Sequence, residues 1–179
     1  MIEQYVNNRS ILFLGPVATK INFCSYDTVF IPGNMIKIID FSCVNNLIIV
    51  VNWWFSVHRL WMLSWYVKTH TNVKAILCTW FRTKHWLEYK GSFLNNITMN
   101  MNHPPIQSNP LLLTFFAYTI VNFNFRKLHI TGINFYETES IKGYKQLPLS
   151  KNHNISENKQ ALKNYICENS RISIDYKLC

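Results

Sequence analysis

Five short, mostly apolar runs recur along the chain, and as a set they do not alternate apolar with polar positions. Strands of this kind are buried on both faces, as in a parallel sheet that helices cover on either side. The runs are residues 11–14, 28–31, 47–51, 73–78 and 128–131. They predict a central, mostly parallel sheet.

The segments between these runs predict the helices. Residues 55–68 and 109–122 can each form a helix, so strands and helices alternate along the chain as in an α/β protein. Residues 95–110 contain five Asn and three Pro, which predicts a loop that cannot lie at the centre of a sheet. We therefore expect one Rossmann-like domain over residues 1–179, with helices on both faces of the sheet.

The carboxyl-terminal part predicts a loop, a helix and a last strand. Residues 137–154 lack periodicity and carry Gly143 and Pro148, which suggests a lid loop. Ser156 is the expected N-cap of a helix that ends near Asn169, and residues 171–176 alternate like a strand.

Composition and charge narrow the class of partner. The chain has 179 residues, of which 49% are apolar and 15% charged, and this excludes a disordered chain. Lys and Arg number 18 against 9 Asp and Glu, and a net charge of +9 favours nucleic acid, an acidic lipid surface or a phosphorylated small molecule. The basic residues stand in ones and twos, which disfavours nucleic acid.

The five cysteines are widely spaced and form no CxxC pair, so neither a zinc site nor a disulfide framework is indicated. We expect reduced cysteines and a cytoplasmic protein. The histidines share no ligand-like spacing, and no metal is expected.

Two apolar segments, residues 47–66 and 111–121, are too interrupted or too short to cross a bilayer. The aromatic residues from Trp53 to Trp65 are expected to pack against the sheet. Peripheral contact with the inner membrane through these residues stays open as an alternative, as does a homo-oligomer.

Glycines and a histidine suggest a nucleotide site. Gly15, Gly33 and Gly132 each follow a short apolar run, where a residue without a Cβ lets the backbone approach a nucleotide or a sugar nucleotide. His153 lies just ahead of a predicted helix, whose positive end disfavours imidazolium. A neutral histidine can act as a general base.

The residues around the last predicted strand, together with three turns upstream, resemble those of a known family. Residues 127–136 form a strand that runs into a Gly-x-x-Phe-Tyr motif, followed by Tyr144 and then His153. Upstream, one strand ends in Gly15-Pro16, and two others lead into Asn34 and Asn52. This arrangement resembles the bacterial sialyltransferases of glycosyltransferase family 42.

The resemblance implies a cytoplasmic enzyme that transfers sialic acid from CMP-sialic acid to a glycan hydroxyl, with inversion and without a metal or other cofactor, as in lipooligosaccharide biosynthesis. It implies that His153 takes the acceptor proton and that Tyr136 and Tyr144 hydrogen-bond the departing phosphate. It also implies a nucleotide site, to which we assign Gly15, Asn34, Asn52, Ser108 and Gly132.

The sequence departs from the family pattern at three places. Leu14 stands where an asparagine often precedes Gly-Pro, residues 107–110 lack the family's glycine, and Asn134 replaces an aspartate. A non-catalytic nucleotide-sugar-binding or assembly module with the same fold is therefore the alternative function.

Overall fold

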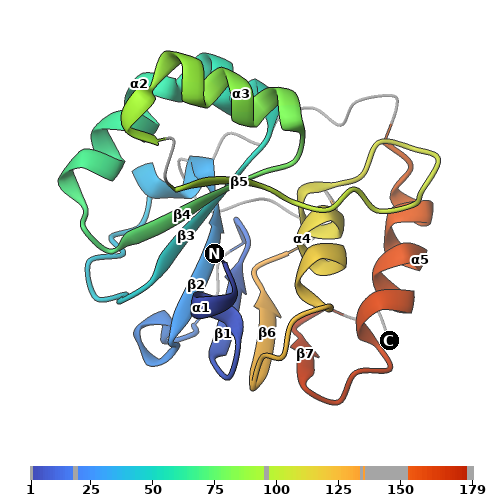
Figure 1. Cartoon of the computed structure of the whole chain (residues 1–179). Helices are drawn as coiled ribbons and strands as arrows, with labels where there is room; N and C mark the ends of the chain where they lie inside the picture. The colour runs from blue at the N-terminus through green and yellow to red at the C-terminus, as the bar shows by residue number, and fades with distance from the viewer. Residues whose placement is uncertain (1, 18–19, 95–96, 134, 136–152, 177–179) are drawn as a thin grey trace.

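Seven parallel strands form a single sheet in the order β5-β4-β3-β2-β1-β6-β7 (Figure 1). The computed structural model describes residues 2–17, 20–94, 97–133, 135 and 153–176. The strands are β1 (Ser10–Leu14), β2 (Thr28–Pro32), β3 (Leu47–Val51), β4 (Val73–Cys78), β5 (Thr98–Asn100), β6 (Lys127–Thr131) and β7 (Ile172–Ile174). This confirms the predicted Rossmann-like α/β fold.

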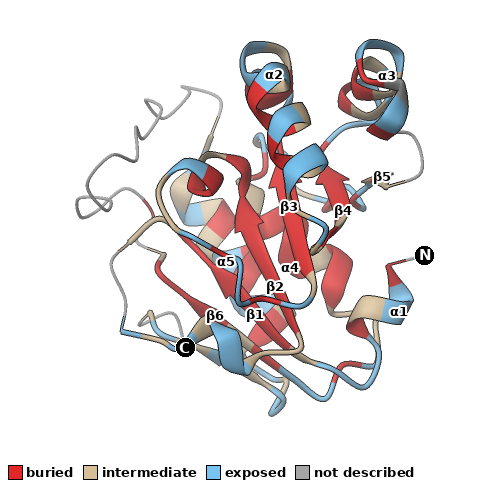
Figure 2. Ribbon diagram, turned by 90° about the vertical axis from the view of Figure 1, so that its left-hand side faces the viewer, coloured by how far each residue is buried: buried red, intermediate tan, exposed pale blue. Residues whose placement is uncertain are grey.

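Helices cover both faces of the sheet, as predicted (Figures 1 and 2). One face carries α4 (Leu112–Ile120) and α5 (Ile155–Ile166), and the other carries η2 (Gly33–Lys37), α2 (Trp53–Thr69) and α3 (Phe81–Lys90). The remaining elements are the short helix α1 (Glu3–Val6) before β1, η1 (Phe23–Ser25) between β1 and β2, and η3 (Ser92–Leu94) between α3 and β5. Of the helices described, none combines the length and apolarity of a membrane span.

The unbroken apolar runs of the strands serve two cores, because successive side chains of a strand point to opposite faces. In β1, Ile11 and Phe13 face α4 and α5, whereas Leu12 and Leu14 face the opposite core. Phe116 of α4 packs on Phe13 at 4.5 Å between ring centroids. Both faces of the sheet are thus buried, which explains why the runs do not alternate.

The strand order creates a topological switch point at β1. The chain proceeds from β1 through β2 to β5 on one side and returns to β6 and β7 on the other. The connections that leave the carboxyl ends of β1 and β6 therefore diverge, and in open α/β sheets ligands bind outside such a point.

Several element boundaries differ from the predictions. The helix expected at 109–122 begins at Leu112, and β5 was not predicted. The N-cap of α5 is Asn154 instead of Ser156, because the Asn154 Oδ1 accepts a hydrogen bond from Glu157 N, and the helix ends at Ile166. The strand predicted in the tail is confirmed as β7.

The prediction of reduced cysteines was wrong. Cys24 and Cys43 form a disulfide across 5.5 Å between Cα atoms, and Cys167 is also disulfide-bonded. Cys78 is a buried free thiol, and burial raises its pKa. The fold brings Cys24 and Cys43 together from segments on either side of β2, so the cysteines do not indicate a reducing compartment.

The expected burial of the tryptophans near residues 53–65 was also wrong. Trp53, Trp54, Trp61 and Trp65 are 44%, 51%, 66% and 60% exposed. The side of α2 that packs on the sheet consists instead of Phe55, Ser56, Met62, Leu63 and Tyr66.

Candidate functional site

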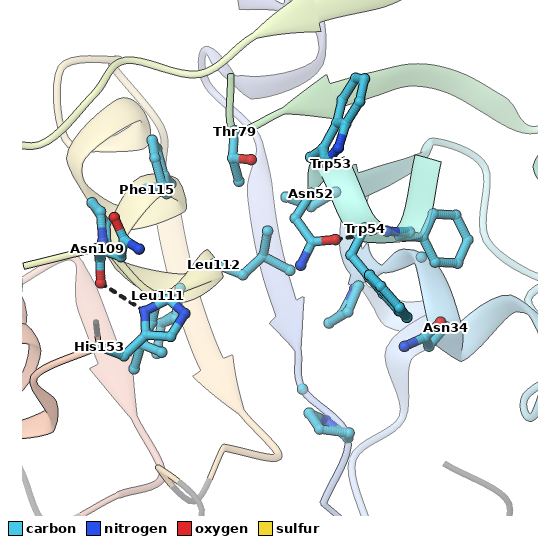
Figure 3. Close-up of a pocket in the computed structure, with 18 of the residues that line it drawn as sticks. Asn34, Asn52, Trp53, Trp54, Thr79, Asn109, Leu111, Leu112, Phe115 and His153 are labelled. Atoms are coloured by element: carbon cyan, nitrogen blue, oxygen red, sulfur yellow. Dashed lines mark hydrogen bonds between the residues drawn. The ribbon is translucent and has the colours of Figure 1, made fainter. Parts of the chain in front are cut away.

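A cavity of about 600 Å³ lies outside the carboxyl ends of β1 to β4 (Figure 3). It is lined by Phe13, Gly15, Pro16, Pro32, Gly33, Asn34, Val50, Asn52, Trp53, Trp54, Phe55, Thr79, Trp80, Asn109, Pro110, Leu111, Leu112, Leu113, Phe115, Ile133, Phe135 and His153. Of the eight residues predicted for the site, Gly15, Asn34, Asn52 and His153 line this cavity. Tyr136 and Tyr144 lie outside the described residues.

Three helices begin at the cavity. The residues that precede or open α2, α4 and α5 are among those that line it, including Asn52, Leu111 and His153. The amino-terminal end of each helix carries a partial positive charge, and its first N–H groups have no partner within the helix. The cavity is therefore suited to an anionic ligand such as a phosphate.

Asn52 joins β3 to α2 and presents its amide at the cavity. Its Oδ1 accepts a hydrogen bond of 2.9 Å from Phe55 N, which makes it the N-cap of α2. In Figure 3 the amide nitrogen points away from this bond. Asn34, in η2, lines the same wall. Two asparagines thus stand where a base or ribose could be hydrogen-bonded.

Gly15 and Gly132 are required for contact between two backbones. Gly15 N donates to Thr131 O at 2.8 Å, and Gly132 adopts φ +69°, which favours glycine. A Cβ on Gly132 would lie 2.6 Å from Gly15 O. Gly132 is not among the cavity-lining residues, so the structure explains this glycine by the packing of the β1 and β6 turns against each other.

Ser108 contacts a carboxylate of the protein itself. Gln107 N and Ser108 N donate to the two oxygens of Glu157, at 2.8 and 2.9 Å. The Ser108 hydroxyl and these two N–H groups hold the pKa of the Glu157 carboxyl below its usual value. Ser108, which we assigned to the nucleotide site, is absent from the cavity lining, and the backbone N–H groups of residues 107 and 108 already bind the Glu157 carboxylate.

His153 is oriented by a backbone carbonyl. Its Nδ1 lies 2.7 Å from Asn109 O, and because a carbonyl only accepts hydrogen bonds, Nδ1 carries a proton (Figure 3). In the neutral ring Nε2 then keeps its lone pair. The residue lines the cavity, so this nitrogen is available to take a proton from a ligand hydroxyl.

A buried asparagine that the sequence did not reveal fixes this arrangement. Asn158 of α5 is fully buried, and its Oδ1 accepts from Leu111 N at 2.8 Å and from Thr114 Oγ1 at 2.7 Å. Its Nδ2 donates to Asn154 O at 2.8 Å. The start of α4 is thereby tied to the start of α5, next to the contact between His153 and Asn109.

Thr79 is a second residue that the sequence did not reveal. It follows β4, is 4% exposed and lines the cavity, and its Oγ1 is buried with no hydrogen-bond partner among the described residues. An unpaired buried hydroxyl is costly, and a bound ligand could supply its partner. Trp80, the next residue, packs on Phe115 at 5.5 Å between ring centroids and extends the aromatic wall.

Phe135 adopts an unusual backbone conformation at the cavity. Its φ is +47°, a left-handed value that an aromatic residue rarely adopts. Its ring is buried, with Tyr176 at 5.0 Å between centroids. Strained residues of this kind cluster at binding sites and persist only where the surroundings hold them.

The described residues hold no group of three or more His, Cys, Asp or Glu side chains that could bind a metal ion. The metal-free mechanism remains a prediction.

The chain was compared with known proteins and structures. No protein-family model and no curated protein sequence matches it. Its fold is similar to that of the sialyltransferase CstII from Campylobacter jejuni, solved in complex with a substrate analogue, cytidine-5'-monophosphate. The TM-score is 0.56 at 8% identity, over 93% of this chain and 79% of that chain. At this identity the likeness shows a shared fold.

Proposed function

We propose that the protein is a glycosyltransferase that moves sialic acid, or a related acidic sugar, from a CMP-activated donor to a glycan hydroxyl. The proposal rests on the geometry of His153. Its Nδ1 is hydrogen-bonded to Asn109 O, and its ring lines a cavity at the carboxyl ends of the strands. The fold likeness to a sialyltransferase solved with CMP supports the same conclusion.

The proposed donor matches the electrostatics of the site. CMP-sialic acid is anionic at both its phosphate and its carboxylate, and the cavity receives the amino-terminal ends of α2, α4 and α5. A net charge of +9 strengthens attraction for such a ligand. In the proposal, Asn34 and Asn52 bind the cytidine.

The proposed reaction requires one base and donors at the leaving group. His153 Nε2 takes the proton of the acceptor hydroxyl while that oxygen attacks the anomeric carbon of the sugar. The bond from this carbon to the phosphate oxygen breaks, and CMP leaves with the bonding electrons. Attack from the opposite side inverts the configuration. Tyr136 and Tyr144 donate hydrogen bonds to the departing phosphate, without a metal ion.

The test is an assay of transfer. The protein is incubated with CMP-sialic acid and a galactose-terminated acceptor, and CMP release is measured with and without EDTA. We expect acceptor-dependent release in both conditions. Release that EDTA abolishes would contradict a metal-free reaction. CMP binding without any release would favour the alternative, a non-catalytic nucleotide-sugar-binding module.

Substitution of Asn52 tests the nucleotide side of the cavity. Asn52→Asp keeps an oxygen that can cap α2 but replaces the amide donor by a carboxylate, which repels the CMP phosphate. We expect CMP binding, measured by calorimetry, to weaken by about tenfold or more, since the lost hydrogen bond to cytidine costs about 0.5–1.5 kcal/mol and the repulsion between the new carboxylate and the phosphate adds to it.

Asn52→Ser is the matched control, because it keeps a capping oxygen without adding a charge. It should lose affinity to a smaller degree and leave the melting temperature close to that of the wild type. Equal CMP affinity of wild type and Asn52→Asp would remove Asn52 from the proposed nucleotide site.

A further inference from the structure

The outward side of α2 and the neighbouring helix α3 expose aromatic side chains. Trp61 and Trp65 are four residues apart and lie on one side of α2, whereas Trp54 precedes the kink that the non-helical Arg59 makes in this helix. Trp54, Trp61 and Trp65 are 51%, 66% and 60% exposed, and Phe81 and Tyr89 of α3 are 59% and 80% exposed. Exposed aromatic side chains gathered on two neighbouring helices mark an interaction surface.

Basic groups accompany these rings. Lys37 Nζ lies 5.4 Å from the centre of the Trp61 ring, and Lys90 Nζ lies 4.8 Å from that of Tyr89. Lys68, on the exposed side of α2, lies 4.6 Å from the ring centre of Phe93. Along α2 and α3 the charged residues are Arg59, Lys68, Arg82, Lys84 and Lys90 against Glu88 alone. The partner of this surface must therefore be anionic.

Trp, Tyr and Lys together fit the boundary of a lipid bilayer. The amphipathic rings of Trp and Tyr sit at the level of the lipid headgroups, and Lys side chains extend towards anionic phosphates. A basic helix with aromatic residues on its free side lies in the plane of this boundary. The opposite side of α2 is already packed on the sheet through Leu63 and Tyr66, so only the outward side can meet lipid.

We propose that the α2–α3 surface, formed by Trp54, Trp61, Trp65, Phe81 and Tyr89 with Lys37, Lys68 and Lys90, binds peripherally to a bilayer that contains anionic lipid. Trp54 also lines the cavity, so the cavity borders this surface. Membrane binding would hold the cavity at the level of the headgroups. The proposal concerns lipid binding alone and does not depend on the transferase reaction.

Vesicle co-sedimentation of the full chain tests the proposal. One set of vesicles contains phosphatidylcholine only, and the other contains phosphatidylcholine mixed with phosphatidylglycerol. We expect strong binding to the mixed vesicles, weak binding to the neutral ones, and a decrease with added salt. Absence of binding to the mixed vesicles would refute the proposal.

Two paired variants separate this surface from general positive charge. Lys68→Glu with Lys90→Glu should reduce binding to the mixed vesicles by about tenfold or more. Lys127→Glu with Lys163→Glu makes the same charge change at exposed positions on β6 and α5, and should bind as the wild type does apart from a small general effect. An equal loss in both pairs would overturn the assignment to α2 and α3.

A third variant tests the aromatic side chains. Trp61→Ser with Trp65→Ser should also lose vesicle binding, with an unchanged circular dichroism spectrum because both rings are exposed. Full retention of binding would contradict the proposal. Analytical ultracentrifugation gives the competing outcome: a dimer of the wild type that this variant abolishes would assign the surface to a second copy of the chain.

Discussion

Replacement of His153 by Ala is expected to lower the rate of sugar transfer by about 10²- to 10⁴-fold, the range over which general bases act. The structure gives the reason: Asn109 O holds Nδ1 as a donor at 2.7 Å, so Nε2 is the nitrogen left to accept a proton at the cavity. Turnover is measured as CMP release under saturating donor and acceptor.

CMP binding by the His153→Ala variant should remain close to that of the wild type. The asparagines proposed to bind cytidine, Asn34 and Asn52, belong to connections that follow β2 and β3, whereas His153 precedes α5. A large fall in turnover with unchanged CMP affinity therefore separates a base from a nucleotide ligand.

His85→Ala is the matched control for this substitution. His85 lies exposed on α3 beside Glu88 and does not line the cavity, so its removal should leave turnover unchanged. If His153→Ala keeps normal turnover and the same dependence of rate on pH, His153 is not the base.

The sheet could be predicted because its central strands are almost entirely apolar. Runs such as 47–51, and 73–78 with Lys74 as its single charged residue, are typical of a sheet that is covered on both faces. Edge elements carry a weaker signal. Strand β5 has three residues, Thr98–Asn100, inside a segment rich in Asn and Pro, and α3 begins after Trp80 without a capping side chain.

The orientation of α2 could not be predicted from spacing alone. Two apolar stripes compete on this helix, one with Trp61 and Trp65 and the other with Met62, Leu63 and Tyr66. Both have helical periodicity, and the sequence does not say which of them packs on the sheet. The pairing of Cys24 with Cys43 could not be predicted either, because it depends on the distance between their Cα atoms, which only the fold sets.

Some site residues could have been found by the rule that selected Asn52. Thr79 is the first polar residue after the run 73–78, just as Asn52 follows 47–51, and both line the cavity. Asn158 offered no such signal. It lies among polar residues of an amphipathic helix, and only the packing of α5 on α4 reveals that it is buried.

Replacement of Asn158 by Leu is expected to destabilise the protein by about 3–5 kcal/mol. Leucine is similar in size but forms no hydrogen bond, so Leu111 N and the Thr114 hydroxyl would lose their acceptor in the interior. Each buried polar group left unpaired costs about 1–3 kcal/mol, whereas Asn154 O keeps the backbone N–H of residue 158 as a donor. Urea unfolding followed by circular dichroism measures the loss.

Thr114→Val is the partner variant that separates the network from simple packing. It removes the hydroxyl that donates to Asn158 Oδ1 but leaves Leu111 N and Asn154 O bonded, so it should cost only about 1 kcal/mol. Because the two residues share a bond, Thr114→Val added to Asn158→Leu should cost less than the sum of the single effects. Additive costs would mean that Asn158 stabilises the protein by filling space, whereas a less-than-additive cost would identify a hydrogen-bonded link between α4 and α5.

If this link holds His153 against Asn109, the Asn158→Leu variant should also turn over more slowly than the wild type at temperatures below its unfolding transition.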